Sequence, residues 1–195
     1  MTKRVEFYFD VGSPASYLAW TQLPAMCERL GASLQYRPML LGAVFKATGN
    51  QTPSNIAAKG SWMQQDMARF ATRYGVPFKR NPYFPVNTLQ LMRGAVWALQ
   101  SGQLDTYLPA VFKAMWVDGV DLNQPTEIGR VLDAAGMPTE AIMAAVADPA
   151  IKSALIEQTN HAIERGVFGA PTMFIADEMH FGQDRLDWVK AALSK

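Results

Sequence analysis

The sequence of 195 residues predicts an α/β fold with strands at both ends of the chain and a block of helices between them. Near the N-terminus, an apolar stretch at 5–11 and an alternating stretch at 33–37 are typical of strands. Strand patterns return only after 171. The residues at 42–165 are rich in Ala, Met, Leu and Gln at helical spacing. These features indicate two groups of strands separated by helices.

The N-terminal elements form a unit of strand, helix and strand. Aromatic and β-branched residues at 5–11, which stop before Gly12, predict a buried strand. A helix is expected over 14–30, with a kink at Pro24 and an end at Gly31. The second strand should lie parallel to the first, because a right-handed crossover joins them.

The middle of the chain predicts five or six helices. Glycines and prolines divide this stretch near Gly75, Pro82, Gly102, Gly119, Gly136 and Pro149.

The C-terminal segment predicts a hairpin and a closing helix. The stretch "PTMFIAD" at 171–177 is typical of a short strand, and "EMHFG" at 178–182 pairs with it through a tight Asp-Glu turn. The closing helix is expected over 184–193.

A βαβ unit followed by ββα is the thioredoxin arrangement. The order of elements therefore predicts a thioredoxin-like domain, formed by 1–41 and 166–195, that is interrupted by a large all-helical insertion at 42–165.

Composition restricts the class of partner. The net charge is +1, with 49% hydrophobic and 18% charged residues, which is typical of a folded globule. No cluster of Lys and Arg interleaves with aromatic residues, so we expect a small molecule rather than nucleic acid. Glu6 and Asp10 interrupt the apolar run that a secretion signal needs, and no uncharged apolar stretch is long enough to span a bilayer. A soluble, cytoplasmic protein is expected.

The cysteine and histidine content narrows the chemistry that the protein's own side chains can perform. Cys27 is the single cysteine, so an internal disulfide and a Cys-x-x-Cys pair are both impossible, and we expect a small buried side chain. The two histidines, His161 and His180, have no partners at metal-ligand spacing, so no metal site is expected. Chemistry must then use oxygen groups, backbone dipoles or a borrowed cofactor.

Ser13 and Pro14 stand where the first helix begins, and one interpretation is an ordinary cap. Redox members of the thioredoxin fold carry Cys-x-x-Cys at this place, whereas here Ser13 and Ser16 occupy the two cysteine positions. A serine hydroxyl cannot exchange disulfides, but it can donate a hydrogen bond to the thiolate of an external thiol. Lowering a thiol pKa from about 8.5 by about two requires roughly 3 kcal/mol, which a hydroxyl and a helix N-terminus can supply.

Two C-terminal motifs can each be interpreted either as an ordinary structural feature or as a ligand contact. Pro171 at a strand start is either a simple turn or a cis proline that lets Ala170 present its backbone to an extended, peptide-like ligand. Gln183 and Asp184 begin the last helix, where Asp184 is either a cap or the partner of a ligand ammonium group.

Four motifs in order, "FYFDVGSPASYL", "GNQTPSN", "HAIERGVFGAPTMF" and "HFGQDRL", resemble the bacterial 2-hydroxychromene-2-carboxylate isomerases, which are similar to kappa-class glutathione transferases. The resemblance covers the whole chain and is strongest at its two ends. It implies a thioredoxin-like domain with a helical insertion, bound glutathione, a serine in place of the redox cysteine, and a homodimer.

The resemblance also implies roles for individual residues. Ser13 would be the catalytic residue at the glutathione sulfur. The remaining glutathione contacts would be Asn50, Lys59, Ala170, Pro171, Gln183 and Asp184.

Substrate contacts are expected in the middle third of the chain, where the resemblance is less distinctive. Trp62, Phe84 and Trp116 would form an aromatic wall, although aromatic residues at such spacings also occur in cores. Asn55 would lie beside Asn50 and Lys59, and Lys46 would meet a substrate carboxylate unless it is simply solvated.

The implied activity is a glutathione-dependent isomerisation of 2-hydroxychromene-2-carboxylate and trans-o-hydroxybenzylidenepyruvate in aromatic catabolism of the naphthalene type. Two alternatives stay open: a kappa-type transferase that consumes glutathione, and a non-catalytic glutathione or peptide carrier.

Overall fold

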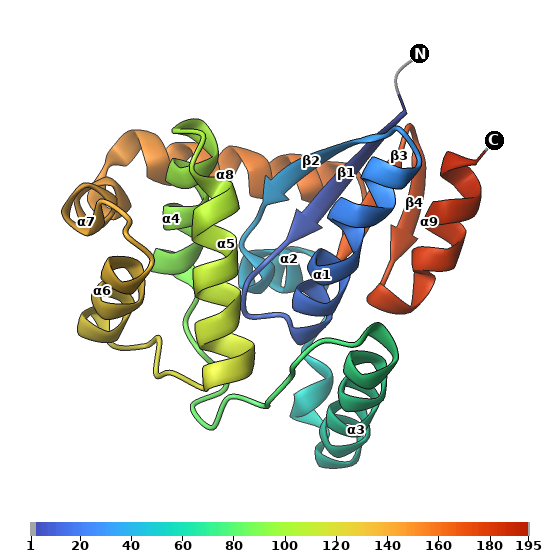
Figure 1. The fold of residues 1–195 in the computed structure, drawn as a ribbon, viewed down its shortest axis with the longest axis horizontal. Coiled ribbons are helices and arrows are strands. Elements are labelled where there is room, and N and C mark those ends of the chain that lie inside the picture. Colours follow the sequence, from blue (N-terminus) through green and yellow to red (C-terminus); the bar gives the residue numbers. More distant parts are fainter. Residues whose placement is uncertain (1–2, 195) are drawn as a thin grey trace.

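The computed structural model describes residues 3–194, and its strands form a four-stranded sheet (Figure 1). The strands are β1 (Arg4–Phe9), β2 (Ser33–Pro38), β3 (Thr172–Ile175) and β4 (Glu178–Phe181), in the spatial order β2-β1-β3-β4. β1 is parallel to β2 and antiparallel to β3, and β3 is antiparallel to β4. The predicted thioredoxin-like order is therefore confirmed.

The helices lie in three parts of the chain: between β1 and β2, between β2 and β3, and after β4. α1 (Pro14–Arg29) joins β1 to β2 and continues through Pro24, and α9 (Leu186–Leu193) closes the fold. Between β2 and β3 come α2 (Leu41–Thr48), α3 (Ala57–Tyr74), α4 (Leu89–Gln100), α5 (Leu104–Lys113), α6 (Pro125–Ala134), α7 (Thr139–Ala147) and α8 (Pro149–Glu164). Within residues 3–194, no helix is both long and apolar enough to cross a membrane.

The helical block contains more helices than the sequence predicted. Seven α-helices lie between β2 and β3, where every residue is described, rather than the five or six that the sequence predicts. The extra helix is α2, which ends at Gly49 in the left-handed conformation, with φ of 73°. A short 3-10 turn, Pro53–Asn55, then separates it from α3. The sequence prediction uses neither Gly49 nor the turn at Pro53–Asn55 as a break between helices.

Three element boundaries also differ from the predictions. β1 stops at Phe9, because the Asp10 carboxylate accepts a hydrogen bond from the Gly12 N–H and turns the chain. The predicted Asp-Glu hairpin turn is wrong. The turn residues are Ala176 and Asp177, because Glu178 already belongs to β4 and pairs with Ile175 of β3. The last α-helix starts two residues late, because a 3-10 turn, Gln183–Arg185, precedes it.

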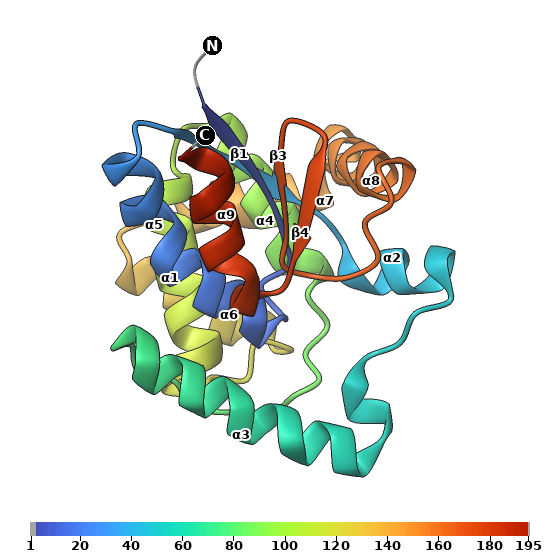
Figure 2. The same cartoon turned by 90° about the vertical axis from the view of Figure 1, so that its right-hand side faces the viewer.

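The two faces of the sheet are buried by different helices. Phe7 and Phe9 on one face belong to the large core that includes residues of α1, α4, α5 and α9. Tyr8 and Phe174 on the other face pack with Val44 of α2 and with residues of α8. Figure 2 shows the sheet standing between α1 and α9 on one side and α8 on the other. This alternation follows the period of two in side-chain direction along a strand.

α3 lies at one end of these layers and joins the large core through Met67 and Ala71. In both views it crosses below the start of α1, near the end of β1 (Figures 1 and 2). The segment 75–88 then leads from α3 back to the main body. Residues of α3, the start of α1 and the returning segment line a common cavity.

A buried carboxylate, Glu6 of β1, connects the sheet to α8. It accepts hydrogen bonds from Arg37 Nε and from an Arg165 guanidinium nitrogen, each at 3.0 Å. Arg165 also stacks on Phe174, with its guanidinium carbon 3.7 Å from the ring centroid. Burial alone would raise the pKa of Glu6, but the hydrogen bonds from Arg37 and Arg165 outweigh it and hold the pKa below its ordinary value of 4.5.

Glu6 should therefore contribute to acid sensitivity. Its lowered pKa stabilises the folded state above pH 4.5, and this contribution is lost as the pH falls through the folded-state pKa. We expect Glu6→Gln to be less stable than wild type at neutral pH and to lose less further stability on acidification, as measured by urea unfolding across pH. Glu157→Gln, which removes an exposed carboxylate of α8, is the control. An identical acid limb in wild type and Glu6→Gln would contradict this account.

Candidate active site

The loop at 10–13 is built around the carboxylate of Asp10. This carboxylate accepts hydrogen bonds from the Gly12 N–H at 2.9 Å, the Leu41 N–H at 2.9 Å and the Thr88 hydroxyl at 3.1 Å. Burial raises the pKa of Asp10, even though the three hydrogen bonds act to lower it. One side chain thus connects the end of β1 to the start of α2 and the start of α4.

Ser13 uses its hydroxyl in two hydrogen bonds. Its oxygen accepts from the Ser16 N–H at 3.1 Å, so the predicted helix cap is confirmed, with Pro14 in the first turn. The same hydroxyl donates to the backbone carbonyl of Ala170 at 3.0 Å. The start of α1 and the turn before β3 therefore meet at this oxygen, although 157 residues separate them.

Ser16 occupies the second cysteine position of the redox pattern. Its side chain is fully buried, and its hydroxyl oxygen has no hydrogen-bond partner among the described residues. Cys27, further along α1, is also buried, and burial raises the pKa of its thiol to about 11. Cys27 is therefore protonated at neutral pH and cannot supply a reactive thiolate.

The turn at Ala170 and Pro171 contains a cis peptide bond, as one of the two predicted alternatives required. The Ala170 carbonyl is occupied by Ser13, whereas the Ala170 N–H has no hydrogen-bond partner in the described part of the chain. The Pro171 carbonyl accepts from the Gly182 N–H at 3.0 Å, which holds the turn against the loop after β4. One backbone donor beside Ser13 is thus available to a ligand.

Gln183 and Asp184 lie on that neighbouring loop. Gln183 is buried, and its carbonyl accepts from the Tyr74 hydroxyl at 2.7 Å. Asp184 is exposed and pairs with Arg185 at 2.5 Å. The interpretation of Asp184 as a helix cap is wrong, because no side chain caps either the 3-10 turn or α9.

The loop between α2 and α3 brings Asn50 to the same region. The Asn50 side-chain amide donates to the carbonyl of Phe168 at 2.8 Å, two residues before Ala170. Asn55 donates to the side chain of Gln51 at 3.0 Å, and Lys59 is exposed on α3. Of the three predicted polar residues, Asn50 thus contacts the segment that carries the cis turn.

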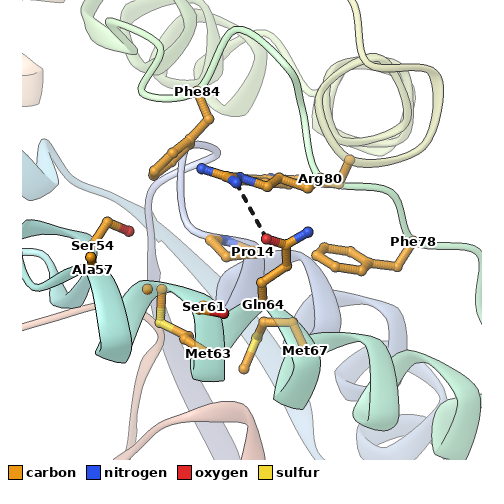
Figure 3. A pocket seen from close by; sticks show the side chains of 12 residues that line it. Pro14, Ser54, Ala57, Ser61, Met63, Gln64, Met67, Phe78, Arg80 and Phe84 are labelled. Carbon is orange, nitrogen blue, oxygen red and sulfur yellow. Dashed lines mark hydrogen bonds between the residues drawn. The ribbon is translucent and has the colours of Figure 1, made fainter.

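A cavity of about 350 Å³ opens beside the start of α1, between α3 and the returning segment (Figure 3). Its lining is mostly apolar and consists of Pro14, Ser54, Ala57, Gly60, Ser61, Met63, Gln64, Met67, Phe78, Arg80, Phe84 and Trp116. Trp116 is 2% exposed, and its indole N–H donates to the Val11 carbonyl at 2.8 Å. Pro14 joins the cavity to the Ser13 loop.

The predicted substrate contacts divide between this cavity and its surroundings. Phe84 and Trp116 line it, with ring centroids 5.9 Å apart. Trp62 is 60% exposed on α3 and is not part of the lining. Lys46, exposed on α2, is likewise outside the lining.

The sequence did not indicate most of the cavity lining, nor two charged side chains of this site, Asp10 and Arg80. Asp10 could have been found, because an acidic residue at the end of a buried strand needs partners. Arg80 carries no local signal, since an arginine in an irregular segment is ordinarily solvated. Its place over the cavity depends on how the segment after α3 folds back.

The fold and this site define a thioredoxin-class protein with serines where redox members have cysteines. Residues 4–194 match the DSBA-like thioredoxin domain family. The 2-hydroxychromene-2-carboxylate isomerase of Sphingobium xenophagum is 33% identical over 195 residues, which cover 99% of each chain. The human glutathione S-transferase kappa 1 is 27% identical, over 96% of this chain and 89% of the other.

A solved structure agrees with these sequence matches. A 2-hydroxychromene-2-carboxylate isomerase superposes with a TM-score of 0.88 and 32% identity, over 97% of this chain and 94% of that chain. The chain therefore belongs to the DSBA-like thioredoxin family and, within it, to the family of 2-hydroxychromene-2-carboxylate isomerases.

The close packing of the loop at 10–13 predicts the effect of a methyl group at Gly12. A Cβ there would lie 2.7 Å from Thr88 Cγ2, and Thr88 cannot rotate away without losing its hydrogen bond to Asp10. We expect Gly12→Ala to lower the free energy of unfolding by about 1–3 kcal/mol in urea titrations. Gly42→Ala is the matched control, because nothing lies within 4 Å of the added atom. Equal stability of the two variants would show that the loop has room to move.

Proposed function

We propose that this chain is a glutathione-dependent isomerase that interconverts 2-hydroxychromene-2-carboxylate and trans-o-hydroxybenzylidenepyruvate. The observation that carries the proposal is the Ser13 hydroxyl, held at the start of α1 and 3.0 Å from the Ala170 carbonyl. Beside it are the Ala170 N–H, which has no hydrogen-bond partner among residues 3–194, and a mostly apolar cavity. Family membership supports the substrate, since relatives at 33% to 35% identity carry this name.

The residues around Ser13 fit the chemical groups of glutathione. The free Ala170 N–H suits the backbone carbonyl of a cysteinyl residue, as in strand-like peptide recognition. Asp184 is exposed and suits the ammonium of the γ-glutamyl group, with Gln183 beside it. Asn50 and Lys59 would contact the remainder of the tripeptide. The kappa-class relatives are named glutathione transferases, which supports the same ligand.

Glutathione would supply a thiolate nucleophile that is regenerated at the end of each turnover. Ser13 would stabilise this anion by turning its hydroxyl hydrogen from the Ala170 carbonyl to the sulfur. A hydrogen bond donated to an anion is stronger than one to a neutral carbonyl, so the exchange is favourable. The N-terminus of α1 adds the positive end of its dipole. Both effects lower the pKa of a bound thiol.

The cavity would hold the aromatic substrate beside the sulfur. Phe84 and Trp116 provide flat apolar walls, and Pro14 places this space next to Ser13. Trp62, Lys46 and Asn55 lie outside the cavity lining, so they would contact only ligand atoms that project beyond it. A homodimer, which rests on the family resemblance, and a cytoplasmic location complete the proposal.

The deciding experiment counts thiols during turnover. We expect conversion of the chromene carboxylate to need catalytic glutathione and to leave its amount unchanged, because Cys27 is buried with a raised pKa. Absorbance of the substrate would be followed while free thiol is titrated colorimetrically.

The other functions predict different thiol counts. Stoichiometric loss of glutathione would assign the chain to the transferases, and full turnover after exhaustive removal of glutathione would eliminate the thiol mechanism. Binding of glutathione without turnover would leave a carrier.

A second experiment tests the role of Ser13. We expect Ser13→Ala to raise the pKa of bound glutathione and to slow turnover roughly tenfold or more at neutral pH, since a hydrogen bond to a charged group is worth about 1.5–3 kcal/mol. Much of the glutathione affinity should remain, through Ala170 and Asp184. Thiolate absorbance of the bound tripeptide, titrated against pH, measures the effect.

The matched control for Ser13→Ala is Asp148→Ala. Asp148 caps α8 by accepting from the Ala150 N–H at 2.7 Å, away from the site. Each substitution removes one helix cap and should cost about 1 kcal/mol of stability. If both variants keep the wild-type thiol pKa and turnover, Ser13 is a cap and nothing more.

A further inference from the structure

Arg80 carries the only charge among the described residues that line the cavity beside Ser13. In Figure 3 its side chain extends across the cavity, with the guanidinium toward Phe84. The one hydrogen bond of this guanidinium goes to the side-chain oxygen of Gln64, at 3.3 Å. No carboxylate of residues 3–194 pairs with it. A fork of N–H donors is therefore held over an apolar space with a single weak partner.

Arg80 is exposed, and it is one of three arginines without a carboxylate partner among residues 3–194. Most arginines form ion pairs with Asp or Glu, namely Arg4, Arg37, Arg69, Arg73, Arg130, Arg165 and Arg185. The two others without a carboxylate partner in the described structure, Arg29 and Arg93, lie outside this cavity. Arg80 is thus the arginine that is both unpaired and placed over the site.

Three aromatic residues line the same cavity as Arg80. The rings of Phe78 and Trp116 are stacked at 20°, with centroids 6.0 Å apart, and Phe84 lies 5.9 Å from Trp116. Such walls suit a flat fused ring, and the guanidinium fork suits the two oxygens of a carboxylate. The two features together describe one ligand, a planar aromatic acid whose carboxylate reaches the cavity rim.

We propose that Arg80 recognises the carboxylate of the substrate, and that the site selects planar aromatic carboxylates over uncharged analogues of the same shape. This inference rests on the proposed function in one respect, that the substrate occupies this cavity. Arg80 takes the role that the sequence had suggested for Lys46, which is outside the lining. Gln64 orients the guanidinium until the ligand arrives.

Ligand binding tests the proposal without turnover. The probes are 2-naphthoate and 2-naphthamide, which have the same ring system and differ in charge. Their dissociation constants would be measured by calorimetry on the full chain with glutathione present. We expect wild type to bind the carboxylate up to about fivefold more tightly, as one ion pair with an exposed guanidinium provides. In Arg80→Gln this preference should disappear, while affinity for 2-naphthamide and for glutathione stays unchanged.

The control is Lys79→Gln, which removes the same charge from the adjacent residue outside the lining. The Lys79 backbone bond to the Trp116 carbonyl does not involve the substituted side chain. We expect Lys79→Gln and Lys46→Gln to keep the preference for the carboxylate. Circular dichroism of each variant establishes that it is folded.

Four results would overturn the assignment of Arg80. They are no preference in wild type, a preference that survives in Arg80→Gln, a preference lost equally in Lys79→Gln or Lys46→Gln, and weaker glutathione binding as the main effect of Arg80→Gln. The last result would indicate that the guanidinium binds a carboxylate of glutathione rather than that of the substrate. If the preference depends on Arg80 but no isomerase activity is found, the ligand class stands and the proposed reaction fails.

Discussion

The buried carboxylate of Asp10 is the interaction on which the site depends. A carboxylate removed from water is costly unless its oxygens accept hydrogen bonds, and here donors from Gly12, Leu41 and Thr88 satisfy it. Because these donors belong to three different elements, the folded state fixes the end of β1 relative to α2 and α4. The loop that carries Ser13 is held in place as a consequence.

Two long-range contacts then assemble the site from opposite ends of the chain. The Ser13 hydroxyl reaches the Ala170 carbonyl, and the Asn50 amide reaches the Phe168 carbonyl. Both contacts end on the backbone of the segment before β3, which the antiparallel pairing of β1 and β3 brings beside the start of α1. The sheet therefore determines that Ser13 and the backbone of the cis turn before β3 lie together.

The helical block supplies most of the cavity beside Ser13. α3 crosses below the start of α1, and the segment after it returns over the opening with Phe78, Arg80 and Phe84. With serines at both cysteine positions, the scaffold cannot exchange disulfides itself. In the proposed function it positions an external thiol, and the cavity decides which ligand lies beside the sulfur.

The sequence by itself determined the order of strands and helices, the cap at Ser13 and the exclusion of a protein disulfide, because these depend on local pattern and residue type. It also indicated Ser13 and Ala170 from local motifs, and Asn50 through the family resemblance. It did not reveal the role of Asp10, the extra helix α2, or Arg80 over the cavity. Only the tertiary structure decided these, because hydrogen bonds between distant segments and the path of an irregular segment depend on packing that no local pattern records.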